Sequence, residues 1–383
     1  MKAFIEPSDV LFFRDARTFN RGDDHIARLI FPPLPMPFYG AIRSSIIAEN
    51  WNNFKEFAGG ASTGASNAVG SSSKLGTMSI SHFSLASKKG TIVERLYPIP
   101  GDLVEIKGGN GAKFLVLSPR KIPAGTKTNL PSPVDTCVLG HGSVGLEEAR
   151  GFLNTQGLSK YLEGKEITED DIVKEDEVFR REYRVGIARS KETGVAKEGM
   201  LYSAEFARLN KSHRGQASSI GFLLEINGED GLLKPRNDKP RILRLGGETR
   251  TAYLETEFSE APAPVSTSKV PRFKSTLLTP AVFTNGWIPD GIDAISGEGI
   301  LNGHRVRLVS AAVNRHVPVG GWDIAARRSK TTKRAVPQGS VYYFELLDST
   351  TIETPQFYFP LCRDEYYSKQ GFGLSIIGDW NYV

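Results

Sequence analysis

The segment FPPLPMPFYGAIRSSIIAEN, residues 31–50, changes from a proline-rich run to a helical pattern. Its prolines exclude a helix before Pro37, and proline suits the first helical position because the N–H that it lacks would have no partner there. From that point apolar residues recur at helical spacing, namely Tyr39, Ile42 and Ile46, with Phe38 beside them. This spacing predicts a helix over residues 37–50 that packs its apolar stripe on a sheet, with Arg43 outside the stripe.

Short strand-like runs surround this helix along most of the chain. Examples are KAFIE (residues 2–6), RVRLVSAAV (305–313) and SVYYFELLD (340–348). Strands with few helices, in two successive blocks, indicate the α+β class. The stretch NGEDGLLKPRNDKP is rich in Gly, Pro and charge, which is typical of a linker. For these 383 residues we therefore expect two domains, 1–230 and 231–383.

Two insertions are expected in the first domain. Residues 183–209 contain two strand-like runs joined by a polar tip, which predicts a projecting β-hairpin. Residues 59–74, GGASTGASNAVGSSSK, are almost all small. Because such a segment buries too little apolar surface to offset the entropy lost on ordering, we expect a mobile loop there.

The composition indicates a cytoplasmic protein without a metal or a cofactor. No run approaches the ~20 apolar residues that span a bilayer, and MKAFIEPSDV has no apolar signal core. Cys137 and Cys362 have no second Cys or His at metal-ligand spacing, so we expect two core residues in a reducing compartment. The net charge of +5 permits a polyanionic partner without requiring one.

The residue patterns of common catalytic sites are absent from the sequence. There is no HExxH helix, GxSxG elbow or GxxxxGK[ST] loop, and the six histidines lie far apart. His25 follows two aspartates, which either orient it as the base of a metal-independent ribonuclease or leave it a surface residue. We therefore expect a protein that is not an enzyme.

Two constellations are rich in basic residues. Five of the eight residues 327–334 are Lys or Arg, which is typical of a solvated loop or of a polyanion contact. FFRDARTF, residues 12–19, offers Arg14 and Arg17 beside Phe19. This group either stacks on and binds RNA or forms ion pairs with Asp15 that shape the loop.

Two further constellations are rich in glycine. In LGGETR, two glycines precede Arg250, which fits a hairpin turn or a backbone nest for an anion. In KQGFGLSIIGDW, Gly371, Gly373 and Gly378 lie beside Lys369. These glycines either let the backbone approach a phosphate closely or form a tight turn before a final strand.

In their order along the chain, these segments resemble the third-subunit family of the type III-B CRISPR (Cmr) effector complex, within the repeat-associated mysterious protein (RAMP) superfamily. The matching stretches are IEPSDVLFFRDARTFNRGDDH, FPPLPMPFYGAIRSSI, YRVGIARSKETGVAKEGMLY, LRLGGETR, VPVGGWD with K…RAVPQGSVYYFE, and GFGLSIIGDW. The resemblance implies two ferredoxin-like domains, similar to RNA-recognition modules, with a C-terminal Gly-rich loop at 371–378. The stretch 59–74 departs from the family pattern.

The resemblance also implies a non-catalytic subunit in antiviral defence that binds and caps the 5′ tag of the crRNA. Its partners would be the large polymerase-like subunit and a backbone RAMP subunit, which the hairpin at 183–209 would help to reach. The residues expected near RNA are Arg14, Arg17, Arg43, Arg250, Lys330, Lys333, Arg334, Gly371 and Gly373. The alternatives are a RAMP-type endoribonuclease that processes CRISPR repeat RNA, and a scaffold whose basic run meets an acidic partner.

Overall fold

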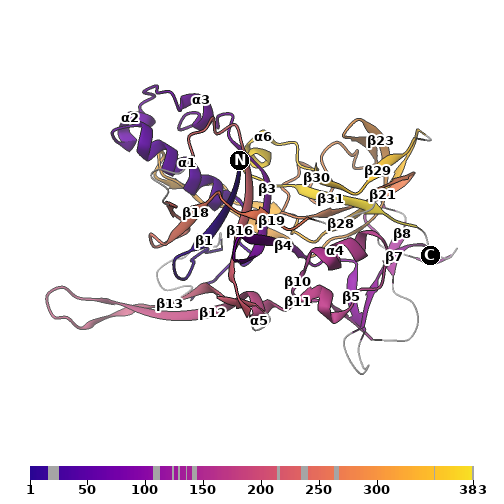
Figure 1. Ribbon diagram of the computed structural model, residues 1–383, viewed down its shortest axis with the longest axis horizontal. Helices are drawn as coiled ribbons and strands as arrows, with labels where there is room; N and C mark the ends of the chain where they lie inside the picture. Colours follow the sequence, from indigo (N-terminus) through magenta and orange to yellow (C-terminus); the bar gives the residue numbers. More distant parts are fainter. Residues whose placement is uncertain are drawn as a thin grey trace.

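A computed structural model describes most of the chain, as strands with few helices (Figure 1). The described residues are 1–15, 26–106, 113–122, 125–127, 130–134, 136–139, 145–213, 216–233, 240–262, 267–348 and 350–381. The expected α+β class is confirmed. No helix among these residues is both long and apolar enough to cross a membrane.

The larger of two main sheets has nine strands in the described residues. Their order is β11-β10-β4-β3-β16-β1-β18-β17, and β19 pairs with β4. The strands are β1 (Lys2–Pro7), β3 (Ser79–Lys89), β4 (Ile92–Pro98), β10 (Phe152–Leu153), β11 (Ile172–Val173), β16 (Ser219–Asn227), β17 (Arg241–Arg244), β18 (Thr251–Glu255) and β19 (Ser259–Glu260).

Helix α1 (Met36–Asn50) connects β1 to β3 and packs on one face of this sheet. It begins with Pro35 as its N-cap and a proline in its first turn, so the predicted helix is confirmed with a start one residue earlier. Phe38, Ile42 and Ile46 are fully buried in the core between helix and sheet. Strand β16 lies between β1 and β3 and is antiparallel to both.

The segment 59–74 was expected to be a mobile loop that buries little apolar surface, but part of it is helical and packs into the core. It contains α3 (Ser66–Val69), which follows the short helix α2 (Phe54–Ala58). Ala65 and Val69 are fully buried and belong to the core beneath α1. Small side chains suffice at these two positions because they pack into the same core as the buried residues of α1.

The smaller sheet has the order β22-β23-β28-β21-β31-β30. Its strands are β21 (Arg272–Leu277), β22 (Glu298–Leu301), β23 (His304–Ala312), β28 (Val341–Leu346), β30 (Gln356–Pro360) and β31 (Leu374–Asp379). The short helix α6 (Glu365–Lys369) lies between β30 and β31 in sequence. The predicted C-terminal Gly-rich loop is therefore corrected, because most of residues 371–378 form a buried strand.

Residues that precede β16 in sequence cover one face of the smaller sheet. They include α4 (Thr155–Leu162), β7 (Ser118–Lys121) and β8 (Thr136–Leu139). Buried Asp102 accepts hydrogen bonds from Tyr161 at 2.8 Å and from Tyr343 at 2.7 Å. The ammonium of Lys274 lies 3.5 Å from the same carboxylate; burial lowers the pKa of Lys274, and Asp102 opposes that shift. This polar cluster joins the first half of the chain to β21 and β28.

The second sheet does not begin at the expected position. Strands β17 and β18 return to the larger sheet, where Leu254 pairs with Ile5. The larger sheet thus continues to Glu260, and the smaller one begins at Arg272. The expected division at residues 230/231 therefore does not separate the two sheets. Strands that pair across long stretches of sequence leave no local pattern from which such a boundary could be predicted.

A long antiparallel pair projects from the larger sheet (Figure 1). It consists of β12 (Phe179–Arg189) and β13 (Ala196–Leu209), and β13 also pairs with the short strand β2 (Ile26–Ala27). The projecting part presents exposed apolar residues of β12 on one face, namely Tyr183, Val185 and Ile187.

Candidate nucleic-acid interface

The two sheets meet at a seam formed by the chain just before α1. Leu34 and Met36 pack there against Val319, Ala335 and Phe372. Leu34 comes from the proline-rich segment that leads into α1, and Phe372 directly precedes β31. The seam therefore brings the start of the first helix next to the glycines at the end of the chain.

One irregular hairpin extends from this seam, and we call residues 317–335 the basic hairpin. Its root is the pair β24 (Val317–Val319) and β27 (Lys333–Ala335), and its outer part is β25 (Trp322–Asp323) and β26 (Arg328–Ser329). The tip is shaped by the Asp323 carboxylate, which accepts a 2.8 Å hydrogen bond from the backbone N–H of Ala326. The buried root fixes the hairpin while its outer part reaches solvent.

The basic hairpin carries five cations without an ion-pair partner among the described residues. They are Arg327, Arg328, Lys330, Lys333 and Arg334. Elsewhere arginines are paired with acids, as Arg208 is with Asp9 and Glu182. Because the charge of the hairpin is not compensated, its surface attracts anions, and phosphates of a nucleic acid would displace only water and counterions there.

Helix α6 holds one of these cations in place. Lys330 donates a 2.8 Å hydrogen bond to the phenol oxygen of Tyr366, whose ring is 38% exposed. The Tyr366 ring also makes an edge-on contact with the ring of Tyr367, at 5.2 Å between ring centres. Lys369 is paired with Glu365 at 2.6 Å, so it does not add a free charge to this surface.

Arg43 lies in this neighbourhood but is used by the protein itself. Its Nε donates a 2.8 Å hydrogen bond to the carbonyl of Val69, and its Nη2 donates to the carbonyl of Ser71. The guanidinium also lies 5.3 Å from the centre of the Phe57 ring. Burial lowers the pKa of Arg43, while Tyr39 and Tyr366 act in the opposite direction. We conclude that Arg43 anchors the 59–74 segment to α1, which is a structural role that the sequence did not reveal.

Gly371 and Gly373 support the seam from within and do not line an open cradle. Both are buried and have positive φ, of 87° and 72°. A Cβ on Gly371 would lie 3.0 Å from Ile80, and one on Gly373 would lie 2.8 Å from the backbone N of Cys362 and overlap its side chain. The expected close approach is therefore to other parts of the protein, namely the side chain of Ile80 for Gly371 and the backbone and side chain of Cys362 for Gly373. Cys362 is buried, as expected for a core cysteine.

The other predicted arginines lie at the base of the β12–β13 hairpin or outside the described residues. Arg250 lies 5.1 Å from the centre of the Phe206 ring and 3.7 Å from the Asp9 carboxylate. Arg14 is exposed and pairs through its backbone with Leu29. Arg17, Phe19 and His25 fall in 16–25, which the structure does not describe.

The two glycines before Arg250 do not form an anion nest. The N–H of Gly247 donates to the carbonyl of Phe12 at 2.8 Å. A Cβ at Gly246 would lie 2.7 Å from that same carbonyl oxygen. Both glycines are therefore explained by close packing of this turn against Phe12.

The face of the larger sheet opposite α1 is crossed by the chain between β18 and β19. Strand β18 pairs with β1 and β19 pairs with β4, so the connection runs over β16 and β3. Phe258 packs there on Phe4 and Leu223. Glu260 pairs with Lys2 at 2.6 Å and with Arg95. Four-stranded RNA-recognition modules stack bases on their sheet, and here that surface is covered in its centre.

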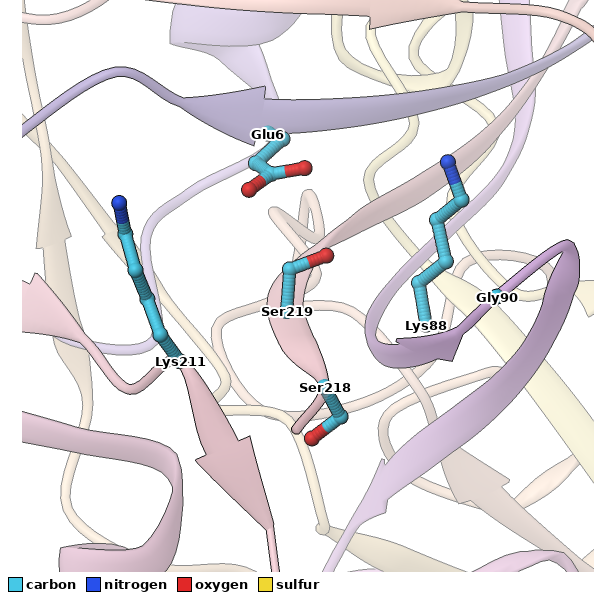
Figure 2. Close-up of a pocket in the computed structure, with 6 residues that line it drawn as sticks. All are labelled: Glu6, Lys88, Gly90, Lys211, Ser218 and Ser219. Atoms are coloured by element: carbon cyan, nitrogen blue, oxygen red, sulfur yellow. The ribbon is translucent and has the colours of Figure 1, made fainter. Parts of the chain in front are cut away.

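A groove of about 290 Å³ remains beside this covered part (Figure 2). Its lining includes Glu6, Lys88, Lys211 and Ser219, and Figure 2 shows Glu6 facing the groove together with both lysines. Lys88 is paired with Glu255. Because two carboxylates offset the two lysines, the groove has little attraction for a phosphate backbone.

Trp322 and Tyr366 are the residues of this surface that the sequence reasoning missed. Trp322 is 60% exposed and stands on the hairpin that carries the five cations. The signal was present, since Trp322 lies a few positions before Arg327 in sequence. In the described part of the chain no cluster of His, Cys, Asp and Glu is suited to hold a metal ion.

Uncompensated cations beside exposed aromatic rings are typical of proteins that bind single-stranded nucleic acid. The family model described as CRISPR-associated protein (Cas_Cmr3) matches residues 3–380. The chain therefore belongs to this Cmr3 family of the type III-B CRISPR system, and the resemblance drawn from its motifs is confirmed.

A chain in a cryo-EM structure of the Type III-B Cmr-beta bound to cognate target RNA and AMPPnP, state 1, is 17% identical, with a TM-score of 0.49 and coverage of 90% of this chain and 86% of that chain. A chain in the Cmr-beta structure bound to cognate target RNA alone is 18% identical, with a TM-score of 0.46 and the same coverage. No curated protein matches the chain.

Proposed function

We propose that this chain is a non-catalytic, cytoplasmic subunit of a type III-B CRISPR effector complex that binds the 5′ tag of the crRNA. The observation that carries the proposal is the basic hairpin, whose five cations have no ion-pair partner among the described residues and which carries Trp322 and contacts Tyr366. This surface has the charge and the aromatic rings that single-stranded RNA requires, and it needs no catalytic group. The family assignment supplies the CRISPR context.

The topology of the sheets supports two ferredoxin-like units. In the larger sheet β16 lies between β1 and β3, which α1 connects, and β18 lies on the other side of β1. In the smaller sheet β28 lies between β21 and β23, and β31 lies on the other side of β21. Both orders match the split arrangement in which the third strand inserts between the first and the second.

The β12–β13 hairpin of this chain is proposed to contact a neighbouring subunit in the complex. Its exposed stripe of Tyr183, Val185 and Ile187 is apolar, and such a stripe on a projecting element favours contact with another subunit or with splayed bases. The proposed protein partners are the large polymerase-like subunit and the first backbone subunit, which this chain would join to one another.

Purification of the tagged chain from its native host in mild salt tests the proposal. RNAs of defined length that share one constant 5′ segment, together with several co-purifying proteins, are the expected result. Heterogeneous RNA, or a chain that elutes alone, would contradict the proposal. Incubation with repeat RNA in EDTA examines the ribonuclease alternative, which cleavage by the wild type and loss of cleavage in His25→Ala would favour.

A further inference from the structure

Trp322 is unusual among the four tryptophans of the chain. It is 60% exposed, whereas Trp51 and Trp380 are 6% exposed and Trp287 is partly buried. Exposure of a large indole surface to water is unfavourable, and such rings are normally buried at least on one side. Among the described residues no ring or cation contact covers Trp322. More than half of the residue's surface is therefore accessible to a ligand.

The backbone around Trp322 is well fixed although its ring is free. Gly321 accepts a 2.9 Å hydrogen bond from the N–H of Lys330 across the hairpin, and Trp322 itself pairs with Ser329. Lys330 is in turn bonded to Tyr366. An exposed ring on a fixed backbone loses little conformational entropy when a planar ligand stacks on it.

The charged residues that lie close to Trp322 on the hairpin indicate which kind of ligand would fit. Arg328 pairs through its backbone with Asp323, next to Trp322, and Arg327 and Lys330 flank the same strand. An apolar pocket of a protein partner would leave these cations without anions. A nucleotide satisfies both features, because its base stacks on the indole while its phosphates pair with the cations.

We propose that Trp322 is a base-stacking residue that holds one unpaired base of single-stranded RNA, with Arg327, Arg328 and Lys330 binding the adjoining phosphates. The inference deepens the proposed function and rests on it. It adds a contact that reads the planar face of a base, whereas the cations read only the backbone. The position of this base within the RNA is fixed by the hairpin, and any of the four bases can fill it.

Fluorescence and affinity of the full-length chain test the inference, with an unstructured oligouridylate as probe. Stacking is expected to quench part of the tryptophan emission, and Trp322→Phe should lose this quenching while it keeps most of the affinity. Trp322→Ala should weaken binding by about 5- to 150-fold, the range for loss of one stacked base, with the salt slope unchanged. Tyr253→Ala removes an aromatic side chain that is 43% exposed on β18 and should change neither quantity.

Each other outcome overturns the inference in a distinct way. Unchanged affinity and quenching in the Trp322 variants, with a lower salt slope in Lys330→Ala, would refute stacking and leave the RNA surface intact. A lower salt slope in Trp322→Ala would mean that the ring only positions the cations. Loss of co-purifying subunits with normal RNA affinity would identify a protein contact. An absence of RNA binding by the wild-type chain would refute the proposed function together with the inference.

Discussion

Lys330 and Tyr366 are joined by a 2.8 Å hydrogen bond although they lie in different elements of the chain. Lys330 follows β26 on the basic hairpin, and Tyr366 belongs to α6, just before the buried glycines that lead into β31. The bond connects the hairpin to the seam on which it is mounted. It leaves the remaining protons of the ammonium for a ligand.

Removal of charge from the basic hairpin should lower the salt dependence of RNA binding. For the variant Lys330→Ala, Lys333→Ala, Arg334→Ala we expect the slope of log K against log salt to decrease by about 0.7 per lost phosphate contact. Titration of single-stranded RNA at several salt concentrations measures it. A matched variant with Lys113, Lys121 and Lys269 changed to Ala removes the same charge elsewhere. Equal slopes in the two variants would exclude these hairpin cations as phosphate ligands.

Gly373→Ala should destabilise the fold, because its Cβ would meet the backbone and side chain of Cys362. We expect a loss of about 1–3 kcal/mol in the free energy of unfolding, measured by urea denaturation. Gly303 has a similar φ of 85° with nothing within 4 Å of an added Cβ, so Gly303→Ala isolates the backbone strain alone. If Gly373→Ala instead has normal stability and a weaker affinity for RNA, this glycine lies next to a phosphate of the RNA.

Arg43→Ala should release the 59–74 segment and leave phosphate binding unchanged. The guanidinium bonds the carbonyls of Val69 and Ser71 at once, and a lysine cannot reproduce this fork, so Arg43→Lys should behave similarly. Limited proteolysis is expected to cleave the segment faster in both variants, with a loss of roughly 1–3 kcal/mol in stability. A reduced salt slope of RNA binding without faster cleavage would instead indicate that Arg43 contacts phosphate.

Stability should fall as the pH drops below the ordinary pKa of histidine, because of His82. Burial lowers the pKa of this imidazole well below its usual value, and its neighbours Arg95 and Lys2 act in the same direction. Below about pH 6.5 the unfolded chain therefore binds a proton that the folded chain does not, and stability declines by up to about 1.4 kcal/mol per pH unit.

Urea denaturation between about pH 7.5 and about pH 5.5 measures this decline. His82→Gln should flatten the profile in that window, whereas His316→Gln, at an exposed position, should reproduce the wild-type curve. A profile that His82→Gln leaves unchanged would assign the pH dependence to other groups.

Local patterns in the sequence predicted the elements better than their partners. The prolines before α1 and its apolar spacing located the helix to within one residue. The expected boundary at 230/231 does not coincide with the change from one sheet to the other, because β18 pairs with β1 from the start of the chain. Such pairing depends on three-dimensional packing and leaves no local signal.

The candidate site was only partly predictable for a related reason. The charge run at 327–334 is visible in the sequence, and in the described part of the chain its cations have no acidic partner, with all of them exposed except half-buried Lys330. Arg43 and Gly373 have the residue types of an RNA contact. In the fold, however, Arg43 bonds the carbonyl of Val69, and Gly373 packs against Cys362. Composition indicates which chemistry a residue offers, and only the fold determines whether the protein uses that chemistry itself.

Ultraviolet crosslinking of the purified effector complex, followed by mapping of the RNA-bound peptides, tests whether this chain binds the 5′ tag of the crRNA. We expect the constant 5′ segment of the crRNA to crosslink to peptides that contain Trp322 or Tyr366. Crosslinks of that segment to other subunits only, with none on this chain, would contradict this expectation.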